Sequence, residues 1–263
     1  MLKRYLKLLW ANYRYSLSYL LEYRVDFFIL MLRRVLNLAF LLFFLNIIFL
    51  QTSVLAGWGK YQVFMLFGSY LIVLNLIKAF VDEGLAEIPE LIRTGKLDIF
   101  LTKPVNSRFF LSTRMFSFDH LFDVFFGMAV IIYSLKNLNF SPPFIQIIIF
   151  FLTIIFAALI FYFIYFLMIT FAIWFVRLDN LRNLFSGIVG MSRVPPTLYK
   201  GAVGFFFNFI IPLSFVSIVP TQAILGLLSL KVVFLEIFVF LLFNFISARF
   251  WGFALRYYTS ASS

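Results

Sequence analysis

Ionisable side chains are scarce in this chain, yet four of them gather in the segment RMFSFDHLFD, residues 114–123. They are Arg114, Asp119, His120 and Asp123. The two aspartates are four positions apart, so a helix would place both on one face. Charged groups within an apolar helix are costly, and they either pair with an opposite charge or serve a function. The segment therefore predicts a polar site in or near a membrane span.

Three interpretations of this site stay open. The side chains of Asp119, His120 and Asp123 could line a path for a polar substrate or a cation. They could hold a metal ion, but one His and two carboxylates on a single helix are a thin ligand set, so we expect no metal. The acids could also pair with basic residues of neighbouring helices, the candidates being Arg33, Arg34, Lys78 and Arg114.

Two further residues stand out in apolar surroundings. Glu236 is an isolated acid in a long apolar run, where it would face Lys231 or a cavity. Pro212 lies in the segment FIIPLSFVSIVP, and proline at membrane depth is tolerated where the backbone is buried in protein or lines a cavity. Both are candidates for a transport pathway.

The composition of the chain shows that these polar residues belong to a membrane protein. The 263 residues are 63% hydrophobic and 13% charged, with 40 Phe and a mean hydropathy of +1.02. One soluble core cannot hide so much apolar surface, so the bilayer must solvate most of it. The absence of cysteine excludes disulfides and thiolate metal sites.

The predicted fold is all-α, a single transmembrane domain over residues 1–263 with six spans. Runs of about 20 apolar residues are typical of membrane helices. A basic, amphipathic helix within residues 1–26 is expected to lie on the inner leaflet, against membrane lipids. The six spans are Phe27–Leu50, Tyr61–Val81, Phe109–Leu135, Phe144–Val176, Phe205–Val219 and Lys231–Trp251.

The basic residues fix the expected orientation. With a cytoplasmic N-terminus, 19 of the 22 Lys and Arg residues fall on the cytoplasmic side, and only Lys60, Lys136 and Lys231 fall outside. This bias follows the positive-inside rule and puts both termini in the cytoplasm. It also accounts for the net charge of +11 without a nucleic-acid partner.

The fifth span has two interpretations. An amphipathic helix at 181–192 could lie on the cytoplasmic side, before a Pro195-Pro196 break and then a span. Alternatively the span starts near Leu181, and residues 195–220 form a re-entrant hairpin on the outer side. In both cases the segment could form the wall of a cavity.

A polar insert, residues 82–108, separates the second and third spans. Pro89 suits the first turn of a short helix and Gly95 suits its C-terminal stop. The helix between them, about 87–94, is too short to be stable alone, so it needs a surface on which to dock. The insert is either a docking element for a soluble partner or an ordinary solvated loop.

Three strings in this chain resemble a known family. GKLDIFLTKPVN after the second span, FIIPLSFVSIVPTQAILG at 209–226 and FALRYYTSASS at 253–263 resemble, in order and spacing, bacterial type-2 ABC exporter permeases. The resemblance covers essentially the whole chain. It implies a multi-pass permease of the bacterial cytoplasmic membrane that works with two ABC ATPase subunits and a second, similar permease.

The resemblance also implies roles for the residues of the insert. They would form a coupling helix that docks on the ATPase, which binds the ATP and Mg²⁺, while this chain needs no cofactor. The chain has no G-x-x-x-x-G-K-[ST] motif, so a partner must hydrolyse ATP. The implied coupling residues are Glu87, Pro89, Glu90, Leu91, Arg93, Gly95, Lys96, Leu97 and Asp98.

Two other functions compete with this one. A secondary transporter would be driven by an ion gradient, and such proteins commonly contain inverted repeats, which we do not find here. A membrane-embedded lipid-modifying enzyme would need catalytic groups, but the chain offers one His, no Cys and no convincing pair of catalytic acids. We therefore expect a transport subunit and not an enzyme.

Overall fold

The structure is a computed structural model that describes residues 2–22, 24–175 and 180–259. The described part is mainly helical, and its two short strands, β1 and β2, form a hairpin. In its first half the elements are α1 (Leu2–Glu22), α2 (Arg24–Gln51), β1 (Val54–Leu55), β2 (Trp58–Gly59), α3 (Lys60–Ile77), the π-helical turn η1 (Lys78–Asp82), α4 (Glu83–Ala86), α5 (Ile88–Arg93), α6 (Asp98–Leu101) and α7 (Ser107–Thr113).

The second half contains the remaining long helices and a set of short ones. Its elements are α8 (Asp119–Asn137), α9 (Phe144–Thr170), the 3₁₀ turn η2 (Phe171–Ile173), α10 (Leu181–Gly190), the 3₁₀ turns η3 (Met191–Arg193) and η4 (Pro196–Leu198), α11 (Gly201–Phe205), the π-helical turn η5 (Phe206–Ile210), α12 (Ser214–Ile224) and α13 (Leu230–Ala254).

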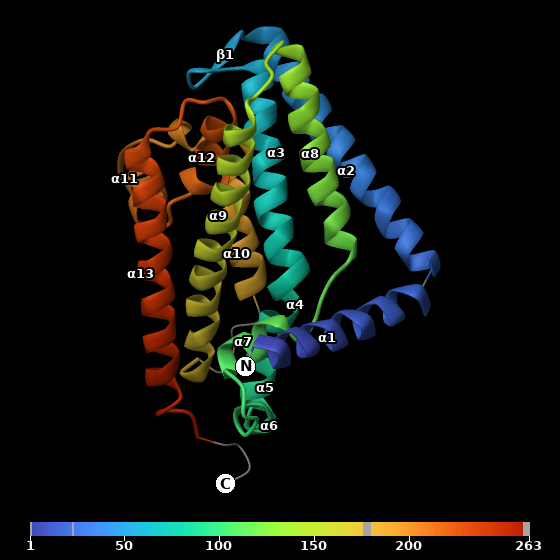
Figure 1. The fold of residues 1–263 in the computed structure, drawn as a ribbon, viewed down its shortest axis with the longest axis vertical. Helices are drawn as coiled ribbons and strands as arrows, with labels where there is room; N and C mark the ends of the chain where they lie inside the picture. The colour runs from blue at the N-terminus through green and yellow to red at the C-terminus, as the bar shows by residue number, and fades with distance from the viewer. Residues whose placement is uncertain (1, 23, 176–179, 260–263) are drawn as a thin grey trace.

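The long helices run between two ends of the molecule (Figure 1). We call the end with the β1–β2 strands the hairpin end and the end with α4–α7 the loop end. Helix α3 occupies the centre and packs against α8, α9 and α12. Its sequence is apolar on all sides, which is typical of a helix buried in a bundle, and most of its residues are buried.

Two glycines bring α3 and α8 into backbone contact. A Cβ on Gly68 would lie 2.8 Å from the Gly127 carbonyl oxygen, and a Cβ on Gly127 would lie 2.7 Å from the Gly68 carbonyl oxygen. Both distances are too short for any side chain. Small residues allow this approach, and close packing is a main source of helix association where water is absent.

In the described residues, four helical stretches are long and apolar enough to cross a membrane: Phe27–Gln51, Lys60–Arg93, Phe144–Ile173 and Leu230–Ala254. They overlap the predicted first, second, fourth and sixth spans. The second stretch continues past Val81 to Arg93, and Val176 lies outside the described residues. The predicted third span, Phe109–Leu135, is not one helix. Residues 107–113 form α7 at the loop end, and α8 starts only at Asp119 and then runs beside α3 (Figure 1).

The predicted fifth span, Phe205–Val219, is also interrupted. The chain leaves its π-helical turn at Ile210, and α12 begins at Ser214, so Pro212 stands in the break. Helix α10 begins at Leu181, which both interpretations of this region expected. After α10 the chain forms α11 with its π-helical turn and then α12, which is buried against α9 and α3.

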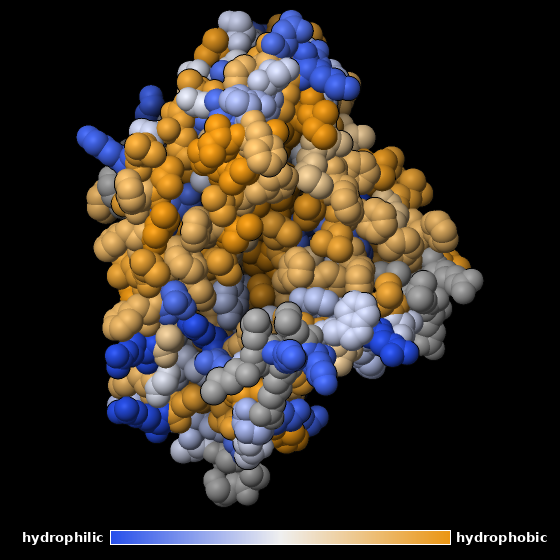
Figure 2. All heavy atoms as spheres, viewed as in Figure 1, coloured by the Kyte–Doolittle hydropathy of each residue, from blue (hydrophilic) through white to orange (hydrophobic). Residues whose placement is uncertain are grey.

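Side-chain distribution matches a protein that spans a bilayer. On the face shown in Figure 2, apolar side chains form a broad band across the middle, and most polar ones lie towards the two ends. Helices α2 and α13 expose most of their apolar side chains, whereas α3 is largely covered. The hairpin end contains the first turns of α3 and α13 and the last turn of α8, which carry Lys60, Lys231 and Lys136 (Figure 1).

Candidate functional site

The polar insert forms the tip of the loop end. The predicted short helix is present as α5, with Pro89 in its first turn. Gly95 has a φ of +69°, a conformation that glycine adopts without strain, and it ends this helix. Helix α6 follows and lies far out at the loop end (Figure 1). The insert is therefore a folded element and not an open loop.

Burial divides the residues of the predicted coupling helix into two groups. Ile88, Leu91 and Leu97 are buried and hold the tip onto the bundle. Glu90, Arg93 and Lys96 are exposed, with Arg93 donating to Glu90 at 2.7 Å. Pro89 and Gly95 shape the backbone. The surface that a partner could touch thus consists of side chains from α5, the following turn and α6.

An apolar residue that the sequence reasoning missed lies on the same surface. Ile99, in α6, has 59% of its surface exposed, although its neighbour Leu97 is wholly buried. Asp98 lies between them at the start of α6. A large exposed aliphatic residue at a polar tip is typical of an interface, because water solvates it poorly.

Ion pairs connect the insert to the helices around it. Arg114 pairs with Glu87 and lies over the ring of Phe100. Arg182, at the start of α10, donates to Asp82 at 2.8 Å and to Glu83 at 2.6 Å. Asp82 has only 2% of its surface exposed. Its carboxylate is therefore a buried charge that depends on Arg182 for compensation.

A second set of polar contacts joins α7 to α9 and α13. Arg108 donates to the Asn244 carbonyl oxygen at 3.2 Å, to Asn244 Oδ1 at 2.9 Å and to Ser247 Oγ at 2.8 Å. Trp251 Nε1 donates to Ser107 Oγ at 3.0 Å. The hydroxyls of Ser112 and Tyr162 lie 2.9 Å apart. Displacing the insert would therefore pull on both long helices.

The amphipathic helix α1 docks on the same insert. Its Tyr5 hydroxyl accepts a hydrogen bond from the backbone N–H of Asn106, and the side chain of its Asn12 donates to the Thr113 carbonyl oxygen. Tyr13 packs against Phe116, and burial raises the pKa of its hydroxyl. The other face of the helix exposes Trp10, Tyr15 and the basic residues Lys3, Lys7 and Arg14. The predicted amphipathic helix thus contacts the insert and also presents an exposed face. Its predicted apolar stripe includes Leu2, Leu6, Leu20 and Leu21, whose side chains lie outside the described part.

The aspartates of α8 pair with a cation, as one of the three interpretations proposed. Arg34 of α2 contacts both Asp119 and Asp123. His120 lies in the same cluster, with its Nδ1 2.9 Å from Asn75 Oδ1. The Asn75 amide group donates to the Leu71 carbonyl oxygen at 2.9 Å, which leaves that Oδ1 free to accept from the imidazole.

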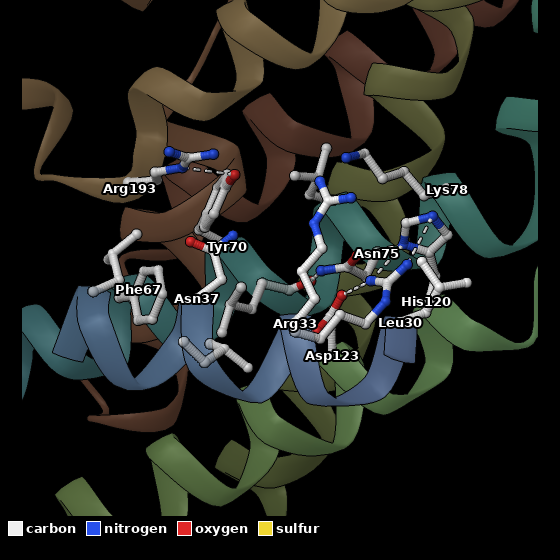
Figure 3. Close-up of a pocket in the computed structure, with 15 residues that line it drawn as sticks. Leu30, Arg33, Asn37, Phe67, Tyr70, Asn75, Lys78, His120, Asp123 and Arg193 are labelled. Carbon is white, nitrogen blue, oxygen red and sulfur yellow. Dashed lines mark hydrogen bonds and ion pairs between the residues drawn. The ribbon is translucent and has the colours of Figure 1, made fainter. Parts of the chain in front are cut away.

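This cluster forms one side of a pocket of about 310 Å³ between α2, α3, α8 and η3. The pocket is also lined by Arg33, Lys78 and Arg193 (Figure 3). Arg193 Nε donates to the Tyr70 hydroxyl at 3.0 Å. Within the described residues, no group of three or more His, Cys, Asp and Glu side chains has an arrangement that could hold a metal ion.

The other two predicted pathway residues lie apart from this pocket. Glu236, near the hairpin end of α13, is fully buried, and both its carboxylate oxygens lack a hydrogen-bond partner in the described structure. Pro212 lies at the break before α12 and is buried. The structure therefore does not bring Glu236 and Pro212 together with Asp119, His120 and Asp123.

Comparison with known proteins identifies the family. A family model described as ABC-2 family transporter protein matches residues 35–262. The chain belongs to the ABC-2 transporter family. No curated protein and no solved structure gives a significant match.

Membership of the ABC-2 family makes this chain the multi-pass membrane permease of an ABC transporter, a transport subunit and not itself an enzyme. An ABC-2 permease works with ATPase partners. This excludes the lipid-modifying enzyme considered above. Arg108 and Arg182, which connect the insert to α13 and α10, were not predicted, because their acceptors lie about 100 or more positions away in the sequence.

Proposed function

We propose that this permease is the membrane subunit of an ATP-driven exporter and that α5 and α6 receive force from the ATPase. The observation that carries the proposal is the construction of the tip. It exposes Arg93, Lys96 and Ile99, whereas Leu91 and Leu97 anchor it from beneath. A short helix held from one side and exposed on the other suits a groove on a soluble partner.

Polar contacts support the transmission of that force. Arg182 connects the insert to α10, and Arg108 connects it to α13. Ser112, in the helix α7 that follows the insert, contacts Tyr162 of α9. A load on α5 would reach three membrane helices without passing through a flexible linker. Rigid, packed elements with few alternative arrangements carry such coupling.

The topology we propose has six crossings and cytoplasmic termini. Helix α8 joins the same two ends as α3, and α10 with α12 forms a broken fifth crossing (Figure 1). The insert and α1 lie at the loop end with most of the basic residues, which supports a cytoplasmic position for that end. The apolar belt and the charge bias suit a bacterial cytoplasmic membrane.

A second, similar permease and two ATPase subunits complete the proposed assembly, with ATP and Mg²⁺ bound by the ATPases. Helices α2 and α13 expose apolar side chains that lipid or a partner permease could contact. We favour a heterodimer on the family resemblance of the three sequence strings. Co-purification with two differently tagged permeases would distinguish a heterodimer from a homodimer.

A pull-down with the ABC ATPase that is this permease's partner tests the coupling surface. We expect Ile99→Asp and Lys96→Glu each to lower the co-purified ATPase by about tenfold or more, because hot-spot residues lie at the centre of an interface. Leu91→Asp is unsuitable, because Leu91 is buried and an aspartate there would disrupt the tip itself.

The matched control is Lys136→Glu, the same charge reversal at the hairpin end of α8. It should leave the complex intact. If both tip variants retain the ATPase as well as this control does, α5 and α6 are not the docking surface. If the wild-type chain moves its substrate with an ion gradient and no ATP, the proposed mechanism is wrong.

A further inference from the structure

The pocket between α2, α3 and α8 has an excess of positive charge that the proposed function does not use. Four cationic side chains line it: Arg33, Arg34, Lys78 and Arg193. The only carboxylate among its lining residues is Asp123. Asp119 adds a second negative charge through its contact with Arg34. In the described structure the cations of this pocket therefore outnumber the carboxylates that compensate them.

Internal pairing does not remove this excess. Arg34 forms ion pairs with both Asp119 and Asp123, and Arg193 donates a hydrogen bond to the neutral Tyr70 hydroxyl. Arg33 and Lys78 make no hydrogen bond or ion pair with any described residue. In Figure 3 the Arg33 side chain extends from α2 towards the end of Lys78. Lys78 feels the charges of Asp82 and Asp123, but each of these carboxylates already has an arginine as its close partner. Two cations without a close ionic partner in one pocket at the edge of an apolar bundle repel one another and favour an anion between them.

We propose that this pocket binds a phosphate group carried by an amphiphile. Arg33 and Lys78 would supply the charge. Tyr70 would supply a hydrogen bond, because Arg193 donates to its oxygen and leaves the phenolic hydrogen free. Guanidinium and ammonium groups are the usual protein partners of phosphate. The cavity volume of about 310 Å³ lies at the lower end of the range for small-ligand sites, about 300–1,000 Å³.

The walls of the pocket indicate the rest of the ligand. Leu30, Leu38 and Leu41 of α2 line it together with Phe67 and Leu71 of α3. The outer face of α2 is a continuous apolar surface. An acyl chain could lie along this surface while the headgroup reaches the cations, whereas a free phosphate ion would gain nothing from it.

A cation is a poor candidate for the same pocket. Its carboxylate, Asp123, already contacts Arg34, and the unpaired groups at the site are themselves cationic. The proposal does not depend on ATPase docking, because the pocket lies within this chain between α2, α3, α8 and η3. It can therefore be tested with the permease alone.

The experiment measures equilibrium binding of fluorescent phosphatidylglycerol to the full-length chain in a neutral detergent. Phosphatidylcholine is the comparison lipid and inorganic phosphate is the competitor. We expect phosphatidylglycerol to bind more tightly than phosphatidylcholine, and Arg33→Gln and Lys78→Gln each to weaken it by about tenfold or more, since each removes a charge-assisted contact. The matched control is Arg249→Gln, an exposed arginine of α13 away from the pocket, which should bind as the wild type does.

Competition by inorganic phosphate separates the two sources of the anion. Displacement at millimolar phosphate means that the charged group alone suffices, which retains the phosphate site and removes the acyl-chain part of the proposal. No displacement supports the whole proposal. If both lipids bind equally, or if Arg33→Gln binds as tightly as Arg249→Gln does, the proposal is overturned. Arg33 is exposed, so this variant remains informative even if Lys78→Gln fails to fold.

Discussion

Replacing Arg108 by glutamine tests whether the insert is fastened to the membrane helices. Arg108 makes three hydrogen bonds to Asn244 and Ser247 of α13, and its guanidinium lies 5.2 Å from the ring centre of Phe163 in α9. One side chain thus joins α7 to two long helices. The Arg108→Gln variant keeps a polar group, but it loses the positive charge and is too short to make most of these contacts.

The expected loss of stability follows from these contacts. A hydrogen bond from a charged donor contributes about 1.5–3 kcal/mol in soluble proteins, whereas polar contacts inside membranes average about 0.6 kcal/mol. Taking about 1 kcal/mol for each bond at this boundary, and about 0.5–1 kcal/mol for the ring contact, gives a gross loss of about 3–4 kcal/mol. Glutamine can restore one hydrogen bond, so we expect a net loss of about 2–3 kcal/mol.

Reversible unfolding of the purified chain in mixed micelles measures this change, with helicity as the readout. The matched control is Arg249→Gln, which removes the same charge from α13 but only one ring contact, with Phe245 at 5.1 Å. The control should lose at most about 1 kcal/mol. If the free energies of unfolding of the two variants differ by less than about 1 kcal/mol, the reasoning about α7 is refuted.

Three further substitutions probe other contacts by the same unfolding measurement. Gly127→Ala should cost about 2 kcal/mol, because its Cβ would lie 2.7 Å from a carbonyl oxygen of α3, while Gly187→Ala, with open space around it, should be neutral. Glu236→Gln should leave stability unchanged or raise it by up to about 2 kcal/mol, because it removes a buried carboxyl that has no described partner. Arg182→Gln should cost about 3 kcal/mol, because it leaves Asp82 buried and uncompensated.

Each of these predictions has an outcome that contradicts it. Equal stability of Gly127→Ala and Gly187→Ala would mean that α3 and α8 do not touch through their backbones. A large loss on Glu236→Gln would reveal that the carboxyl has a partner. Adding Asp82→Asn to Arg182→Gln should recover most of the lost stability, and no recovery would show that the arginine acts otherwise than by compensating that charge.

The features that sequence predicted well depend on local patterns. Long apolar runs gave four of the spans, and Pro89 and Gly95 gave the short helix α5, because both residues restrict their own backbone. The pairing of Asp119 and Asp123 with Arg34 was one of the candidate pairings, since a charge at membrane depth needs a partner and the chain offers few. The helix that was predicted to begin at Phe109 begins only at Asp119, because residues 107–113 form the separate helix α7.

By itself the sequence determined that this chain is a membrane protein and that its insert would contain a helix. It also predicted that most basic residues lie on one side of the membrane. These results depend on composition and local backbone preference, which need no distant contact. Only the tertiary structure decided which face of that helix is free. It buried Leu97 and exposed Ile99. It also left Arg33 and Lys78 without a described partner in one pocket. Such outcomes depend on which helices pack together, and packing joins side chains that lie far apart in the sequence.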